Sequence, residues 1–88
     1  MIEYVERYSA TDELDELGRW ARIAVFKHIT IAWISKHKDE NGNYIFMVNN
    51  RFPTMCNDTA TETKVCKSLE ESKDFINERW EWFREQVK

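Results

Sequence analysis

Residues 68–88, SLEESKDFINERWEWFREQVK, decide the fold because they predict one long amphipathic helix at the end of the chain. Ser68 and Glu71 have the spacing of a capping box, in which a hydroxyl and a carboxylate satisfy the first backbone amides of a helix. Neither Gly nor Pro interrupts the stretch, so we expect about five to six helical turns. One face collects the side chains expected to cover the core: Leu69, Ser72, Lys73, Ile76, Trp80, Phe83 and Val87.

The opposite face of the predicted helix is acidic, and it is a candidate surface for a basic partner. A solvated face without a binding role is the ordinary interpretation of such a pattern. The acidic residues are Glu70, Glu71, Asp74, Glu78, Glu81 and Glu85.

Three further residues of the helix, Phe75, Arg79 and Trp82, lie on a flank between the two faces. They either widen the core stripe or form a ridge for a partner, since aromatic residues and Arg are enriched at interface hot spots. Phe75 and Trp82 are also a candidate seam for a homodimer. The carboxylates that would steer a basic partner towards the ridge are those of Glu78, Glu81 and Glu85.

The length of 88 residues predicts a single domain, 1–88, with one modest hydrophobic core. An apolar fraction of 42% and an aromatic fraction of 14% favour a packed domain over a disordered one. The formal net charge of −3 disfavours a non-specific nucleic-acid binder, which needs clustered Lys and Arg.

Targeting signals are not evident, and we expect a cytoplasmic protein that does not enter a membrane. Met1 leads directly into the polar stretch Ile2–Arg7, without the apolar region of a signal peptide. The chain has no run of about eighteen apolar residues that would span a bilayer. Its two cysteines, Cys56 and Cys66, do not suggest a disulfide-stabilised secreted domain.

The first quarter of the chain predicts a short helix. Met1–Tyr8 alternates weakly and fits either a short strand or a frayed helical turn. Ser9–Asp12 then has the composition of a helix start, and carboxylates crowd the turns that follow. Leu14 and Leu17 share a helical face, so we predict a helix over about Thr11–Arg22.

The run Ile23–Ser35 is rich in β-branched and aromatic residues and predicts a strand. Asn41-Gly42 then has the composition of a two-residue hairpin turn, whose central residues need positive φ. That turn would pair His37 with Phe46, Ser35 with Val48 and Trp33 with Asn50. The hairpin face predicted to form the core holds Ile29, Ile31, Trp33, Phe46 and Val48.

A third strand is predicted over Thr61–Lys67, after a break at Asn49–Pro53 and a polar loop at Thr54–Ala60. The strand leads directly into Ser68. The predicted fold class is therefore α+β: a three-stranded antiparallel meander packed by the long C-terminal helix, with a short N-terminal helix at another edge.

Catalytic and metal-binding motifs are not evident in the sequence. Cys56, Cys66, His28 and His37 lack the spacing of a zinc site. His37 and Cys66 form a base–nucleophile pair only if the fold brings them together. With two glycines, the chain has no loop of the kind that cradles phosphates. We therefore expect a protein that is not an enzyme and that uses no cofactor or metal.

The sheet offers a second candidate surface, for single-stranded nucleic acid. Trp33 would stack on a base, and Lys36 and Lys38 would neutralise phosphates. The ordinary interpretation is that lysines near strand ends keep a sheet edge soluble.

The closing pattern, a strand over Glu62–Lys67 that feeds the helix start Ser68–Ile76, resembles the ending of many small proteins of phages and mobile elements. These include inhibitors of host defence systems, among them anti-CRISPR proteins. The resemblance implies a stoichiometric inhibitor in the host cytoplasm that blocks a host protein by occupying its surface. The expected function is that of a binding protein, which acts through its acidic and aromatic C-terminal helix on a partner with a basic surface.

Overall fold

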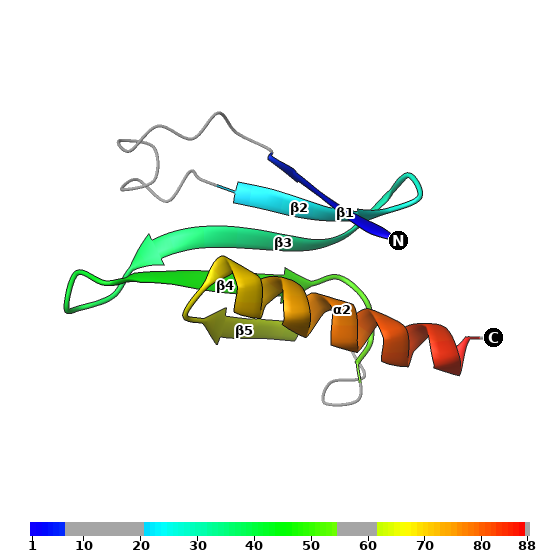
Figure 1. The fold of residues 1–88 in the computed structure, drawn as a ribbon. Coiled ribbons are helices and arrows are strands. Elements are labelled where there is room, and N and C mark those ends of the chain that lie inside the picture. Colours follow the sequence, from blue (N-terminus) through cyan, green and yellow to red (C-terminus); the bar gives the residue numbers. More distant parts are fainter. Residues whose placement is uncertain (7–20, 55–61, 88) are drawn as a thin grey trace.

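The computed structural model describes residues 1–6, 21–54 and 62–87, which form one antiparallel sheet with one helix across it (Figure 1). The strands follow one another in space in the order of the chain, β1-β2-β3-β4-β5. The fold class is therefore α+β, with the predicted C-terminal helix. The elements are β1 (Ile2–Glu6), β2 (Ala21–Phe26), β3 (Ile29–Lys38), β4 (Tyr44–Asn50), β5 (Glu62–Cys66) and α2 (Leu69–Gln86).

The sheet has five strands in the described residues, so the prediction of three was wrong. The N-terminal stretch left open between strand and helix forms β1. The predicted strand Ile23–Ser35 is two strands, because the chain reverses at Lys27-His28 and pairs Phe26 with Ile29. The predicted helix Thr11–Arg22 lies outside the described residues except for its end, which belongs to β2.

The β3–β4 hairpin turns where it was predicted, but through a longer loop. The Asp39 amide donates to the Asn43 carbonyl at 2.8 Å, and the Gly42 amide donates to the Asp39 carbonyl at 3.1 Å. Gly42 has φ 80. A type I turn followed by a left-handed Gly is the usual three-residue hairpin loop. The Asp39 carboxylate supports it by accepting from the amides of Asn41 and Asn43, each at 2.9 Å.

This loop shifts the register by one residue from the prediction, so that His37 lies opposite Ile45 and Trp33 opposite Asn49. Because side chains alternate along a strand, a shift of one residue exchanges the faces of one strand relative to the other. On β3 the predicted core residue Ile31 is buried. The predicted core residue Val48 of β4 is buried too, but the buried residue opposite it on β3 is Ile34. Trp33 lies on the opposite face of the sheet from both.

Helix α2 begins at the predicted cap. The Ser68 hydroxyl accepts from the Glu71 amide at 3.0 Å, while the Glu71 carboxylate accepts from the Lys67 amide at 2.7 Å, one residue before the amide predicted. Ser72 and Ile76 are fully buried. The first three turns of the helix therefore match the predicted core stripe, whereas Val87 at its end is 63% exposed.

An aromatic cluster holds the C-terminal half of α2 on the sheet. The Trp80 ring lies 4.9 Å from Phe52, 5.1 Å from Phe26 and 5.4 Å from Phe83, measured between ring centroids. At the β1 edge, the Tyr4 hydroxyl donates to Asn77 Oδ1 at 2.9 Å. Burial of the phenol, and secondarily the charge of Asp74, raise the pKa of Tyr4 to about 12. The helix is thus fixed to the first strand of the sheet as well as to the last.

Candidate partner-binding surface

The outer side of α2 carries an exposed row of carboxylates, which we call the acidic strip. The helix has six acidic and three basic residues, while the whole chain has sixteen and thirteen. The rest of the chain is therefore neutral, and α2 accounts for the entire net charge of −3. Glu71 serves the cap, so the strip consists of the five exposed residues Glu70, Asp74, Glu78, Glu81 and Glu85.

The three cations of α2 lie over aromatic rings of the protein itself. Contacts of this kind hold a cation at about 6 Å or less from a ring centroid. They direct the positive charges back towards the sheet and leave the carboxylates as the outward charges. The pairs are Lys73 over Tyr4 at 5.1 Å, Arg79 over Phe75 at 4.8 Å and Arg84 over Phe26 at 5.0 Å.

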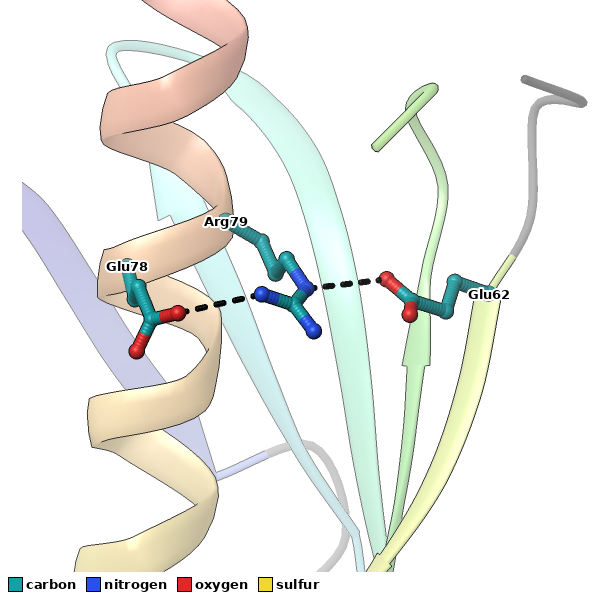
Figure 2. A network of polar contacts seen from close by, with 3 residues as sticks. All are labelled: Glu62, Glu78 and Arg79. Atoms are coloured by element: carbon teal, nitrogen blue, oxygen red, sulfur yellow. Dashed lines mark hydrogen bonds and ion pairs between the residues drawn. The ribbon is translucent and has the colours of Figure 1, made fainter. Parts of the chain in front are cut away.

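Arg79 is a bridge between α2 and β5 (Figure 2). Its Nε donates to Glu62 Oε1 at 3.3 Å, and its Nη1 donates to Glu78 Oε1 at 3.0 Å. The side chains of Arg79 and Glu62 are each 14% exposed, whereas that of Glu78 is 69% exposed. The guanidinium is therefore occupied within the molecule and partly withdrawn from solvent.

The predicted ridge is not an exposed surface. Phe75 is 8% exposed and belongs to the core, below Arg79 and beside Lys64, whose Nζ lies 5.4 Å from the ring. Trp82 is half-buried. The structure thus agrees with the interpretation in which these residues widen the core stripe, and the carboxylates at 78, 81 and 85 are the candidate contacts that remain outward.

The residues of the nucleic-acid candidate lie on opposite sides of the sheet. Trp33 is opposite Asn49 on the face away from α2, whereas Lys36 is opposite Phe46 on the face that α2 covers. The ammonium groups of Lys36 and Lys38 lie over the Tyr44 ring, at 4.2 and 5.5 Å. One strand of nucleic acid on one face cannot contact all three residues.

The possible base–nucleophile pair is also divided between the faces. Cys66 is fully buried on the helix side opposite Phe46, and burial raises the pKa of its thiol against the opposing effect of a hydrogen bond from Ser72. His37 lies on the other face, with Nε2 at 2.8 Å from the Ser35 hydroxyl. Within the described residues, no three His, Cys, Asp or Glu side chains are grouped to hold a metal ion. Among those same residues, no helix combines the length and apolar character needed to cross a bilayer.

A shallow cleft of about 440 Å³ borders the acidic strip, between β1 and α2. Phe26 and Trp80 give it an aromatic lining, and Glu81 and Arg84 are charged residues in its wall. Sequence reasoning missed this cleft because Ile2, Phe26 and Trp80 come from three distant parts of the chain. The one local signal was the acidic face of the helix.

Comparison with known proteins finds no relative for this chain. No family model matches it, and neither a curated protein nor a solved structure is significantly similar.

Proposed function

We propose that this protein is a non-enzymatic binding protein that engages a basic surface of a partner protein through the acidic strip. The observation that carries the proposal is the placement of charge on α2. All three cations of the helix turn back onto aromatic rings, while five carboxylates remain exposed on its outer side. A surface of one sign attracts a partner of the other sign and speeds encounter.

The spacing of the carboxylates favours a partner that otherwise binds nucleic acid. From Glu70 to Glu85 the helix rises about 22 Å, so successive carboxylates of the strip are about 4.5–6 Å apart along the axis. A nucleic-acid strand carries one phosphate for about every 3.4 Å. Like the phosphates of a nucleic-acid strand, the carboxylates of the strip form a row of negative charges, although the row is less dense. Such a row fits a groove lined with Lys and Arg.

The cleft beside Glu81 supplies an anchor for such a partner. Interfaces concentrate their binding energy in a few side chains that fill pockets. Arg84 already lies over the Phe26 ring. The Trp80 side of the lining suits the alkyl stem of a Lys or the plane of an Arg, and Glu81 would accept a hydrogen bond from its cationic end. The cleft would thus bind one Lys or Arg side chain of the partner, and the acidic strip would bind the basic surface around that side chain.

Binding of this kind would make the protein a stoichiometric inhibitor, as the resemblance to small phage proteins implies. A protein that occupies a basic groove competes with the nucleic acid that the groove holds. We therefore expect inhibition that saturates at a fixed ratio of the two proteins and that nucleic acid relieves.

The test is capture of partners from nuclease-treated bacterial lysate by the wild type and by an E81Q/E85Q variant. The two glutamates form a like-charge pair four residues apart, so their neutralisation should leave the fold intact. A matched control, E3Q/E40Q, removes two exposed carboxylates outside α2. We expect one protein band to be retained by the wild type and the control and lost by E81Q/E85Q.

The affinity for the captured protein should fall with added salt, and less steeply for the E81Q/E85Q variant. Equal capture by all three proteins, or an affinity that salt does not change, would show that the acidic strip is not the binding surface.

A further inference from the structure

The face of the sheet away from α2, which we call the open face, carries apolar side chains on each of the five described strands. Residues paired between neighbouring strands lie on the same face of the sheet, so the register identifies the residues of the open face. Val5 pairs with Ile23, Ile23 with Trp33, and Met47 with Val65. These residues alternate with the buried residues that face the helix. The apolar side chains of the open face are Val5, Ile23, Val25, Trp33, Ile45, Met47 and Val65.

The open face also holds the neutral polar residues Ser35, Asn49 and Thr63, but it is more apolar than a sheet face in contact with water usually is. An antiparallel sheet with one solvated face normally presents polar side chains there. Within the described strands, the ionisable residues of the open face are Glu3 at one edge and His37 towards one end of β3. Val5 is 43% exposed and Val65 54% exposed. An apolar surface of this extent indicates an interaction site.

We propose that a second copy of this chain covers the open face, in a twofold dimer of two sheets packed face to face. The inference does not depend on the acidic strip, which lies on the other side of the sheet. Two twisted sheets pack in this way at about 10 Å, with their inner side chains interdigitated.

The distribution of charge selects a copy of the same chain as the occupant. In a twofold dimer the same surface of both copies forms the interface. A surface whose charges are mostly of one sign therefore repels its copy. The helix side carries the acidic strip and would repel its copy. The open face has no charge in its interior, so it is complementary to itself, and it offers no charges to select a charged partner of another kind.

The area of the open face is sufficient for a dimer. Five strands about 4.8 Å apart, presenting about six residues each at about 3.3 Å, give a face of roughly 24 by 20 Å. Two copies would then bury about 1,000 Å² together, twice the area of the face, which is the lower limit for a specific interface.

The order of the strands also predicts that Trp33 lies near the centre of this interface. β3 is the central strand, and a twofold axis in the plane between the sheets lays β3 on its copy, whether the axis runs along the strands or across them. Trp33 then lies near the centre, where aromatic anchors contribute most. β1 and β5 lie at the two sides of the sheet, so each of them lies over its own copy or over the other strand.

The test is the molar mass in solution, by sedimentation equilibrium, of the wild type and a V5K/V65K variant. Both valines are exposed in the single chain, so lysine there does not require burial of a charge. In either orientation of the dimer, the lysines of the two chains would place four charges in an apolar interface. A control variant, I29K/V87K, adds the same two charges at positions 67% and 63% exposed, outside the open face.

We expect the wild type and I29K/V87K to have twice the 10.7 kDa mass of the chain at about 100 µM, and V5K/V65K to have the mass of one chain with an unchanged circular dichroism spectrum. Acrylamide quenching of the total tryptophan fluorescence, to which Trp33 is one of four contributors, should increase in V5K/V65K. A wild type that remains a single chain at this concentration overturns the proposal. A dimer that survives V5K/V65K overturns it as well.

Discussion

Replacement of Arg79 by alanine tests whether this residue stabilises the fold or contacts a partner. The charge-assisted hydrogen bond to the partly buried Glu62 contributes about 1.5–2 kcal/mol, and the stacking on Phe75 about 0.5–1 kcal/mol. We therefore expect R79A to lower the free energy of unfolding by about 2–3 kcal/mol. For a domain of this size, that corresponds to a fall in Tm of roughly 10–20 °C.

Urea unfolding followed by circular dichroism measures this loss, and a double-mutant cycle with E62Q isolates the pair. The matched control is R84A, because Arg84 is an exposed cation on the same helix that also lies over a ring. R84A should cost less than about 1 kcal/mol. The free energy of unfolding of R79A could instead lie within about 0.5 kcal/mol of the wild-type value while the variant no longer captures the partner. Arg79 would then be an interface residue, and its stabilising role would be refuted.

Three further changes follow from particular groups in the structure. Asn50 is fully buried and neither of its amide atoms has a hydrogen-bond partner among the described residues, so N50L should raise the free energy of unfolding by about 2 kcal/mol in urea. Lys27 has φ 55, where a Cβ is unfavourable, so K27G should raise the free energy of unfolding by about 1 kcal/mol despite the flexibility of glycine. The pKa of Tyr4 near 12 means that the folded state retains a proton that the unfolded state loses from pH 10 upwards, so stability should be constant below pH 10 and fall between pH 10 and 12.

Each of these predictions has its own control. N49L, on the exposed neighbour of Asn50, should change stability by less than about 0.5 kcal/mol, and a destabilised N50L would mean that the amide has a partner. H28G changes the other residue of the same turn. If H28G raised the free energy of unfolding as much as K27G does, the gain in K27G could not be attributed to the removal of the Lys27 Cβ from a positive-φ position. In Y4F the fall in stability between pH 10 and 12 should be reduced.

The sequence predicted well the features that depend on local chemistry. The cap at Ser68 and the apolar period of the helix involve residues within one or two turns of each other, and both are present in the structure. The strand at residues 62–66 and the position of the β3–β4 turn were predicted for the same reason.

Features that depend on register were not predicted. Asn41-Gly42 fits a two-residue loop as well as the three-residue loop that is present, because both place a residue with positive φ at a glycine. The Asp39 carboxylate, which accepts from two amides of the loop, favours the longer one. The turn at Lys27-His28 has none of Gly, Asn, Asp or Pro, so nothing local marked the boundary of β2 and β3.

The flank of the helix could not be assigned from periodicity alone. Phe75 and Arg79 stand at an angle where a residue is buried only if a strand lies beside that flank, and β5 does. Glu62, which pairs with Arg79, is seventeen residues earlier in the chain. A helical wheel contains no information about such a partner, so the same residues that resemble an interface ridge in sequence form a stabilising bridge in the fold.

The two sides of the sheet differ in charge, and this difference separates two possible binding surfaces. All the net charge lies on α2, while the open face is apolar and almost without charge. A dimer through the open face would direct the two acidic strips outward on opposite sides, each free to meet a basic surface. Dimerisation through the helices would instead bring ten strip carboxylates together and cover the surface that attracts a partner. The arrangement of charge therefore favours self-association through one side and binding through the other, and neither role requires a residue of the other side.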